Sequence, residues 1–478
     1  MSSSPSASPS LSNADFAQLP LSQAMLANLQ QLGYLQMTPI QAAALPLALA
    51  GNDLIAQAST GSGKTAAFAL ALLNKLDVKR QSVQALVLCP TRELADQVTQ
   101  EIRRLARAED NIKILTLCGG ATMRPQMASL EHGAHIVVGT PGRLMDHLER
   151  GSLDLTALNT LVLDEADRML DMGFFDDIAK VARQCPKNRQ TLLFSATYPE
   201  GIAKLSQQFL REPKEVKLKA LHAEQKISQL FFEVTETERL HTVARLLRHY
   251  RPASTLAFCN TRQQCRDLVE VLRAEGIEAQ ALHGELEQRE RDQVLLQFAN
   301  RSSSVLVATD VASRGIDIAG LEAVINVDIT TETEVHIHRV GRTGRADAQG
   351  LALSLASLDE MGRVGNIEVL QGGEVTWGKL TDLTDSQPGQ KLLPPMRTLQ
   401  ILGGRKDKIR PGDVQGAFTG EAGFAASQIG KINVTEFSTY VAVERSIAEE
   451  AVLRLNAGKL KGRKVRVRFL EDVMNGTA

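Results

Sequence analysis

One segment constrains the fold of this chain more than any other: the glycine-containing run Ala58–Thr65, which reads Ala-Ser-Thr-Gly-Ser-Gly-Lys-Thr. The apolar residues within Asp53–Ala58 predict a strand directly before it, and the alanine- and leucine-rich run Ala66–Leu73 predicts a helix directly after it. A strand, a glycine loop and a helix in this order place a phosphate group at the helix N-terminus. The sequence therefore predicts an α/β fold with a site for a nucleoside triphosphate.

The residue types in this loop suit a triphosphate. Gly61 and Gly63 have no Cβ atom, so backbone N–H groups can approach phosphate oxygens. Lys64 can reach the terminal phosphates, and the Thr65 hydroxyl suits a magnesium ion. The usual pattern opens with glycine where this chain has Ala58. We expect the nucleotide to contact the whole loop: Ala58, Ser59, Thr60, Gly61, Ser62, Gly63, Lys64 and Thr65.

Two carboxylates, Asp164 and Glu165, follow the apolar run Leu161–Leu163. This run predicts a buried parallel strand, and such a strand directs the residues that follow it toward the crevice where α/β sheets bind ligands. Asp164 would hold magnesium, and Glu165 would orient or deprotonate the attacking water. A solvated acidic strand end would look the same alone, but the phosphate loop favours the catalytic interpretation.

Two arginines further along the chain, Arg342 and Arg345, are three positions apart. On a helix this spacing places both guanidinium groups on one face, where they suit a γ-phosphate that gains charge during transfer. A solvated basic helix is the alternative. The small or hydroxyl residues Gly341, Thr343 and Gly344 indicate instead that another group approaches the backbone closely.

Together these segments resemble the DEAD-box RNA helicases, and the likeness extends over residues 16–355. The resemblance implies two RecA-like lobes, with ATP and Mg2+ as cofactors and the arginines supplied to the nucleotide from the second lobe. The magnesium residues would be Thr65 and Asp164. The segment Gly33–Gln41 resembles the adenine-reading segment of the family. The nucleotide contacts implied outside the loop are Phe16, Thr38, Gln41 and Asp317.

Other segments resemble the family's RNA-binding and coupling motifs. The implied RNA contacts in the first lobe are Pro90, Thr91, Arg92, Gly120, Thr140, Pro141, Gly142 and Arg143. Those in the second lobe are Gln288, Arg291, Thr309 and Asp310. The residues implied to couple hydrolysis to lobe closure are Ser195, Thr197 and His338.

The order of the expected elements divides the chain into domains. Strands alternate with helices through residues 14–212, the first lobe, and again through 227–372, the second lobe, which favours two parallel sheets covered by helices. We expect a linker over 213–226, a second linker over 373–395 and tails at 1–13 and 472–478. The serine- and proline-rich start of the chain lacks the features of a signal peptide and predicts disorder.

The bulk properties are consistent with an intracellular enzyme. The chain has 478 residues, 43% of them hydrophobic, which is enough for about three domains with apolar cores. Its five cysteines show no metal-ligand spacing and predict reduced core thiols without a disulfide partner in a cytoplasmic protein. We find no apolar stretch of membrane-spanning length. The net charge of −1 indicates that any basic surface must be local.

A third domain is expected over residues 396–471. It contains 14 Lys and Arg against 8 Asp and Glu, a net charge of +6. Its hydrophobic pattern predicts the element order β-α-β-β-α-β, which is that of an α+β RRM-like domain. The usual aromatic platform for base stacking is thin, because Phe437 and Tyr440 are present but Thr398–Leu402 carries no aromatic residue.

The last predicted strand, Arg463–Leu470, alternates basic and apolar residues. A period of two places the basic residues on one face, where they can bind RNA phosphates; an edge strand protected from aggregation would look similar. The domain resembles the C-terminal domain of DbpA-type bacterial helicases, which implies binding to 23S rRNA in pre-50S ribosomal particles. The expected RNA contacts are Lys459, Lys461, Lys464, Arg466 and Arg468.

These predictions favour an RNA-dependent ATPase that locally unwinds short RNA duplexes during large ribosomal subunit assembly. An RNA-stimulated clamp that remodels protein–RNA contacts would use the same residues. A non-catalytic RNA-binding scaffold would not need the complete catalytic set. A DNA helicase is a further alternative that a comparison of matched RNA and DNA duplexes would separate.

Overall fold

The computed structural model describes residues 15–58, 61–198, 200–218, 227–313, 321–344 and 349–470. Four predicted nucleotide residues, Ser59, Thr60, Asp317 and Arg345, lie outside these ranges. The described residues form two compact units, the first ending at 218 and the second beginning at 227. The second unit contains both the second lobe and the C-terminal domain.

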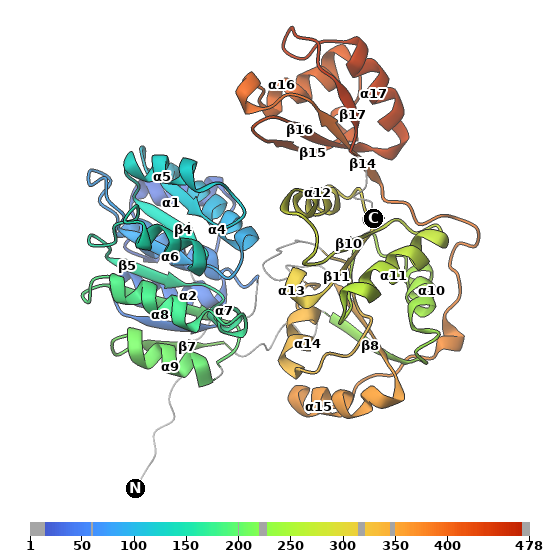
Figure 1. The fold of residues 1–478 in the computed structure, drawn as a ribbon, viewed down its shortest axis with the longest axis horizontal. Coiled ribbons are helices and arrows are strands. Elements are labelled where there is room, and N and C mark those ends of the chain that lie inside the picture. The colour runs from blue at the N-terminus through green and yellow to red at the C-terminus, as the bar shows by residue number, and fades with distance from the viewer. Residues whose placement is uncertain are drawn as a thin grey trace. The chain divides into compact units, whose positions relative to one another are not determined.

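The first lobe is built on a parallel seven-stranded sheet with the order β3-β4-β2-β5-β6-β1-β7 (Figure 1). All strand pairs in it are parallel, and most of its central residues are fully buried and aliphatic. Such runs form strands buried on both faces. The strands are β1 (Leu54–Gln57), β2 (Ala85–Leu88), β3 (Ile114–Leu117), β4 (Ile136–Gly139), β5 (Thr160–Leu163), β6 (Gln190–Ser195) and β7 (Lys214–Lys217).

Helices cover both faces of this sheet. The first four α-helices pack on one face and the last four on the other, and each set encloses its own apolar core. Among the described residues, every helix of the chain is too short or too polar to span a bilayer. The helical elements are η1 (Phe16–Gln18), α1 (Gln23–Gln31), α2 (Pro39–Leu49), α3 (Lys64–Asn74), α4 (Arg92–Leu105), η2 (Ala106–Ala108), α5 (Met123–Glu131), α6 (Pro141–Glu149), α7 (Ala166–Asp171), α8 (Phe175–Gln184) and α9 (Glu200–Phe209).

The second lobe contains a parallel six-stranded sheet with the order β10-β11-β9-β12-β13-β8. Its strands are β8 (Ile227–Glu233), β9 (Thr255–Phe258), β10 (Ala279–Leu282), β11 (Val305–Ala308), β12 (Ala323–Asn326) and β13 (Gly350–Ala356). Its helical elements are α10 (Arg239–Tyr250), α11 (Arg262–Ala274), α12 (Gln288–Ala299), α13 (Asp310–Ser313), α14 (Thr333–Val340), η3 (Leu358–Glu360) and α15 (Met361–Gln371). Helices α10 and α11 cover one face of the sheet and form its larger core.

The C-terminal domain has an antiparallel sheet with the order β15-β16-β14-β17, covered on one face by helices (Figure 1). Its order of elements confirms the predicted β-α-β-β-α-β pattern. The strands are β14 (Met396–Ile401), β15 (Ile429–Val434), β16 (Thr439–Glu444) and β17 (Val467–Phe469). The helical elements are η5 (Arg405–Asp407), α16 (Pro411–Gly416), η6 (Ala417–Glu421), η7 (Ala426–Gln428), η8 (Arg445–Ile447) and α17 (Ala448–Ala457).

The predicted linker over 213–226 is wrong in its first part. Strand β7 lies within it and pairs in parallel with β1. Only Val216 of this strand is buried, because its neighbours are lysines and a glutamate that face solvent at the sheet edge. Charged residues on an edge strand protect it from pairing with other chains, and they also hide its strand character in the sequence.

The predicted linker over 373–395, which we call the packed connector, lies against the second lobe. It includes the short helix η4 (Leu380–Asp382). The Trp377 ring packs edge-on against Phe231, with 5.9 Å between the ring centroids. Gly378 lies so close to Phe232 that an added Cβ would be 2.4 Å from its ring. Leu392 is buried and forms a parallel bridge with Ile277. The connector is therefore part of the folded lobe.

Candidate functional site

The glycine loop and the predicted adenine segment meet at Gly63. Gly63 has φ of 96° and caps the N-terminus of α3, a backbone conformation that favours glycine. A Cβ atom there would lie 2.6 Å from Gln41 Nε2 and 2.9 Å from Thr38 Oγ1. Gln41 is fully buried and donates to the Gly63 carbonyl at 3.1 Å, while its Oε1 accepts from Thr38 N at 2.9 Å. The fold therefore brings two distant predicted segments into one site.

Lys64 is the first residue of α3 and is 6% exposed. Its Nζ donates a 2.7 Å hydrogen bond to the Ala58 carbonyl, at the start of the loop. Thr65 follows it on the helix. A buried ammonium group at a helix N-terminus, together with backbone N–H groups, forms a strongly anion-favouring site.

Asp164 and Glu165 follow β5, whose neighbour β6 lies next to β1, so this pair and the glycine loop share one edge of the sheet. Burial raises the pKa of Asp164 to about 7, with the charge on Glu165 adding to the shift and Lys64 opposing it. A nearby cation favours the ionised form of such a carboxyl group. Carboxylate and hydroxyl oxygens are ligands that Mg2+ prefers, so Asp164 and Thr65 fit a magnesium ion.

Glu165 is held in an unusual backbone conformation, with φ of 51° just before α7. Its Oε2 forms a 2.7 Å ion pair with Arg168 Nη1, and both side chains are less than a tenth exposed. Arg168 had no assigned role in the sequence analysis. Because it fixes one oxygen of Glu165, it positions the carboxylate that was predicted to act on water.

Asp167 connects this carboxylate segment to the predicted coupling residues. Its Oδ2 accepts from Thr197 N at 2.9 Å, from Thr197 Oγ1 at 3.0 Å and from Ala196 N at 3.1 Å. Ser195 Oγ accepts from Asp167 N at 3.3 Å. Asp167 was not among the predicted site residues, although its place two residues after Glu165 was a usable signal. The structure thus places Ser195 and Thr197 in direct contact with Asp167, two residues after Glu165.

The loop that contains these coupling residues also contacts the glycine loop. Ala58 N donates to the Ser195 carbonyl at 3.1 Å, and Gln57 Nε2 donates to the Ala196 carbonyl at 3.3 Å. A movement of residues 195–197 would therefore change contacts both at the phosphate loop and at Asp167.

Phe16, predicted at the adenine base, is 3% exposed and packs edge-on against Tyr34 in the lobe core.

The predicted RNA contacts of the first lobe lie after strands β2, β3 and β4, at the same edge of the sheet as the glycine loop. Arg143 holds two of these segments together, because its Nη1 donates to the Ala121 carbonyl and to Gln126 Oε1, both at 3.0 Å. Gly120 has φ of 74° in this contacted loop. The predicted residues in this group are Pro90, Thr91, Arg92, Gly120, Thr140, Pro141, Gly142 and Arg143.

The predicted RNA contacts of the second lobe are Gln288, Arg291, Thr309 and Asp310, and one of them, Asp310, pairs with a buried arginine that was not predicted as a site residue. Arg339 is 1% exposed, and its guanidinium pairs with both oxygens of Asp310 at 2.8 and 2.6 Å. It also donates to Asn260 Oδ1 and to the Asp328 carbonyl. Arg291 donates to the Ala312 carbonyl. The predicted RNA-contact segments on α12 and α13 are therefore joined by a hydrogen bond.

The helical interpretation of Arg342 and Arg345 is wrong for Arg342. Helix α14 ends at Val340, with Gly341 as its C-cap, so Arg342 follows the helix in a turn. Thr343 then forms a parallel bridge with Leu321, and its hydroxyl donates to the Leu321 carbonyl at 2.7 Å. Gly341 caps the end of α14, and Gly344 has a positive φ of 66°. The chain therefore turns where the spacing predicted a helix. Arg342 itself is 6% exposed, and His338 lies in α14.

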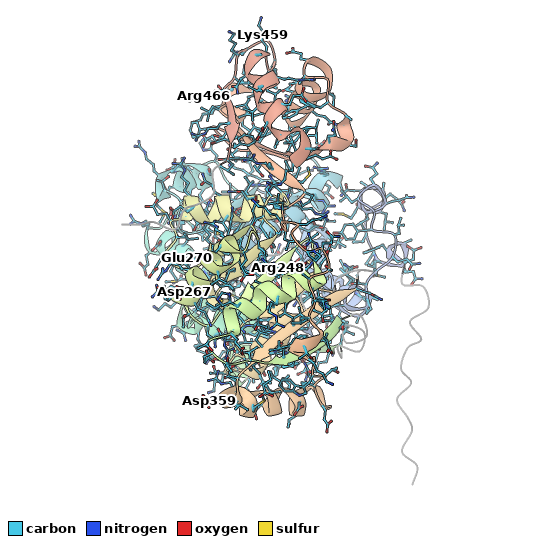
Figure 2. The ribbon with its side chains drawn as sticks, turned by 90° about the vertical axis from the view of Figure 1, so that its right-hand side faces the viewer. Arg248, Asp267, Glu270, Asp359, Lys459 and Arg466 are labelled. Carbon is cyan, nitrogen blue, oxygen red and sulfur yellow. The ribbon has the colours of Figure 1, made fainter. Side chains whose placement is uncertain are left out.

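The basic residues of the C-terminal domain differ in their surroundings. Lys464, Arg466 and Arg468 are exposed and alternate with the buried or half-buried Val465, Val467 and Phe469, as predicted. The strand itself is shorter than predicted, since β17 begins only at Val467. Figure 2 shows Lys459 and Arg466 directed outward from this domain.

Lys461 has a structural contact as well. Its Nζ donates to the Lys408 carbonyl at 2.8 Å and lies 3.3 Å from Asp413 Oδ2. Its exposed side chain thus links the end of η5 to helix α16. The predicted RNA-binding role of Lys461 stays a prediction, but substituting it would also disturb this link.

The outer face of the C-terminal sheet packs against the second lobe. Thr398 is 4% exposed; its Oγ1 accepts from Asn300 Nδ2 at 3.2 Å and lies 2.8 Å from Ser302 Oγ. Asn433 Nδ2 donates to Asn300 Oδ1 at 3.2 Å. An ion pair of 2.7 Å joins Arg445 to Glu278 beside these contacts. The face on which many RRM domains stack bases is therefore partly covered here.

Family models match three successive parts of the chain. The DEAD/DEAH box helicase model matches residues 38–205, the helicase conserved C-terminal domain matches residues 238–347, and the DbpA RNA binding domain matches residues 398–469. The chain is 51% identical over 451 residues to the ATP-dependent RNA helicase DbpA of Escherichia coli, covering 94% of this chain and 98% of that protein. This chain belongs to the DEAD-box ATP-dependent RNA helicases. The family resemblance predicted from the motifs is confirmed.

Other relatives agree with this assignment of the helicase lobes. The DEAD-box ATP-dependent RNA helicase CshA of Geobacillus kaustophilus is 40% identical, with 81% of this chain and 83% of that protein covered. Among solved structures, Saccharomyces cerevisiae Dbp5 bound to RNA and ADP BeF3 is similar with a TM-score of 0.72 and 30% identity, covering 77% of this chain and 96% of that one. The helicase thus uses ATP and binds RNA.

Proposed function

We propose that this DEAD-box helicase is an RNA-dependent ATPase that opens short RNA duplexes locally, and that its C-terminal domain targets it to 23S rRNA in pre-50S particles. The observation that carries the targeting is the match of residues 398–469 to a DbpA RNA binding domain. That domain has a net charge of +6 in a chain of net charge −1. Such a local basic surface attaches the motor to RNA phosphates.

The phosphate end of ATP would be held by residues of the glycine loop. Lys64 is buried at the start of α3, where its charge adds to that of the helix N-terminus. Thr65 and Asp164 would hold Mg2+, which when bound neutralises charge on the phosphates. Gln41 has both a donor and an acceptor in its amide group, which suits the adenine edge.

Glu165 would act as the general base for the attacking water. Its ion pair with Arg168 keeps one carboxylate oxygen in place and leaves the other for hydrogen bonding to water. Asp167 would transmit changes at this segment to Ser195 and Thr197, because it already receives three hydrogen bonds from residues 196 and 197. Arg342 would stabilise the charge that develops on the γ-phosphate.

The helicase lobes would contact the RNA backbone without reading its sequence, since hydrogen bonds to phosphate and sugar carry no base information. Recognition of one RNA would then depend on the C-terminal domain. We also propose that the enzyme works in the cytoplasm. The five cysteines are all free and buried, which fits a reducing compartment.

The targeting proposal is tested by RNA-stimulated ATP hydrolysis. A variant lacking residues 396–478 should respond weakly and equally to any RNA, whereas the intact chain should respond best to fragments of 23S rRNA. Neutralising Lys464, Arg466 and Arg468 together to glutamine should reproduce much of the deletion. If these residues bind phosphates, the slope of log affinity against log salt should shrink by about 0.7–0.9 for each phosphate that is no longer neutralised.

A matched control removes the same charge elsewhere. Lys180, Arg183 and Lys187 are exposed on or next to α8 of the first lobe, and changing all three to glutamine should leave the preference for 23S rRNA fragments intact. Equal stimulation of the intact chain by unrelated RNA would refute the targeting. ATP hydrolysis without strand separation would indicate the clamp instead of the helicase.

A further inference from the structure

A polar cavity of about 300 Å³ lies where the C-terminal domain meets helix α12 of the second lobe. We call it the composite cavity, because both domains line it. Its walls consist of Glu287, Arg289, Glu290 and Gln293 from the second lobe and Gln400, Arg468 and Leu470 from the C-terminal domain. An apolar cavity of about 150 Å³ already admits benzene, so this one has room for a nucleobase.

We propose that the composite cavity binds one unpaired base of the RNA substrate, with guanine as the best match. This inference rests on the proposed RNA-dependent activity and extends it to a base-specific contact. Guanine presents the acceptors O6 and N7, which an arginine guanidinium can bind in a bidentate manner. It also presents N–H donors, which a carboxylate can accept. The cavity offers both groups, with Arg468 from one domain and Glu290 from the other.

The charges of the cavity favour a base over a backbone phosphate. Arg289 and Arg468 are balanced by Glu287 and Glu290, so the lining carries no net charge. A phosphate at this place would meet two carboxylates and would be repelled by them. A base edge carries donors as well as acceptors and can pair with both kinds of side chain.

The key guanidinium is already oriented. Arg468 lies opposite Gln400 in the pairing of β17 with β14, and its Nε donates to Gln400 Oε1 at 3.0 Å. Gln400 is 4% exposed and donates in turn to Ser438 Oγ at 3.2 Å. A guanidinium held through its Nε keeps its two terminal nitrogens as donors in a fixed plane. Such preorganisation reduces the entropy lost on binding.

The position of the cavity also suits a strand of RNA. Its α12 wall is the first turn of the helix, which carries the predicted RNA contacts Gln288 and Arg291. Its other wall includes Arg468 of β17, two residues after the exposed Arg466, which is also a predicted RNA contact. The polar contacts of Asn300 and Ser302 with Thr398 hold the two walls together. The cavity thus lies between two surfaces that are each predicted to bind RNA.

The test uses the full-length protein and hairpin RNAs with an eight-nucleotide single-stranded tail of random sequence. RNAs retained by the protein are sequenced, and affinities of selected tails are measured by fluorescence anisotropy at one salt concentration. The parent should enrich guanine at one tail position. Replacing that guanine by adenine or by an abasic site should weaken binding by about tenfold or more, as expected when a bidentate arginine–base pair is removed.

Arg468→Gln should remove this preference, and Arg466→Gln is the matched control. Both substitutions remove one positive charge from the same exposed strand segment, but only Arg468 lines the cavity. Arg466→Gln can therefore lower the overall affinity yet must retain the guanine preference. Glu290→Gln, which keeps an acceptor for the backbone N–H of Glu287, should lower the ratio of guanine to adenine binding.

The outcomes separate this inference from the proposed function. If the parent hydrolyses ATP in response to RNA but shows no base preference in the tail, the composite cavity is not a base site. Equal effects of Arg468→Gln and Arg466→Gln, or equal weakening with every tail including the abasic one, would mean a phosphate contact and would also overturn it. If RNA neither binds nor stimulates the parent, the proposed RNA-dependent activity itself fails.

Discussion

The two helicase lobes share one topology and have a basic residue at the same position, but the partners of that residue differ between the lobes. If the strands of each lobe are counted in chain order, both sheets arrange their first six strands as third, fourth, second, fifth, sixth and first. In each lobe the first strand leads to a helix that begins with a basic residue. This residue is Lys64 in the first lobe and Arg239 in the second.

The surroundings of these two cations differ. Lys64 follows a glycine loop, and its Nζ bonds a backbone carbonyl. Arg239 is 2% exposed and is surrounded by carboxylates of its own lobe: it pairs with Glu236, with Glu360 at 2.8 Å and with Asp328 at 3.5 Å. The second lobe therefore balances the charge of Arg239 with its own carboxylates, whereas Lys64 is the proposed phosphate ligand of the first lobe. Two lobes of one topology thus differ in the local chemistry at this position.

The largest expected effect concerns Arg342. Unlike Arg239, this cation of the second lobe is proposed to act on ATP. Arg342→Ala should lower ATP turnover by about 10³-fold or more, as loss of an arginine finger does. Steady-state hydrolysis at saturating RNA measures this. The control Arg248→Ala removes a cation of α10 that pairs with Glu275 and should change turnover by less than about twofold. Normal turnover in Arg342→Ala would contradict the assignment.

Glu165→Gln should have the next largest effect. It retains size but removes a base, so turnover should fall by about 10²–10⁴-fold. ATP affinity should stay nearly unchanged, and the variant should remain bound to RNA in the presence of ATP. Single-turnover hydrolysis and nucleotide titration measure the two quantities. Parent-like hydrolysis would show that Glu165 is not the base.

Arg239→Ala tests the second half of the comparison through stability. Removing one partner of a buried ion network should destabilise the second lobe by about 3–5 kcal/mol, because buried carboxylates lose their partner. Hydrogen exchange in peptides from residues 239–360 reports this lobe alone. Lys64→Ala is the matched change in the first lobe; it should abolish nucleotide binding with little effect on exchange. Equal exchange in both variants would break the proposed contrast.

The smallest expected effect is on base choice. Gln41→Ala should weaken ATP binding and reduce the preference for ATP over GTP, by about tenfold if one hydrogen-bonding group is lost. Competition between ATP and GTP measures the preference. Gln36, which is exposed in the same segment, supplies the control Gln36→Ala. A parent enzyme that uses GTP as well as ATP would refute the role of Gln41.

The sequence predicted the fold and the site wherever local pattern and chemistry coincide. Most apolar residues within Asp53–Ala58 and the apolar run Leu161–Leu163, which predicted strands, lie in β1 and β5. Glycines and carboxylates at strand ends then located the loop of Lys64 and the pair Asp164 and Glu165. The sheet topology brings these strand ends to one edge, but the contacts of Arg168 and Asp167 with the predicted residues came only from the structure.

Long-range pairing was beyond the sequence alone. The sequence next to Arg239 and Arg339 does not indicate their distant partners: Glu360 is about 120 positions from Arg239, and Asp310 is 29 positions from Arg339. Of the two residues before Arg342, only Gly341 indicates that helix α14 ends there. The edge strand β7 was missed because its exposed charged residues conceal its pairing with β1.

The packed connector over residues 373–395 determines how far the C-terminal domain can reach. A flexible chain of about 23 residues would have a root-mean-square span of roughly 25–30 Å and would let an attached domain search a large volume. Here Trp377, Gly378 and Leu392 pack the connector against the second lobe, so the packed connector can extend very little. An RNA bound to the C-terminal domain would then lie at a fixed distance from the second lobe. The enzyme would act on duplexes that lie at this distance from the RNA segment bound by the C-terminal domain.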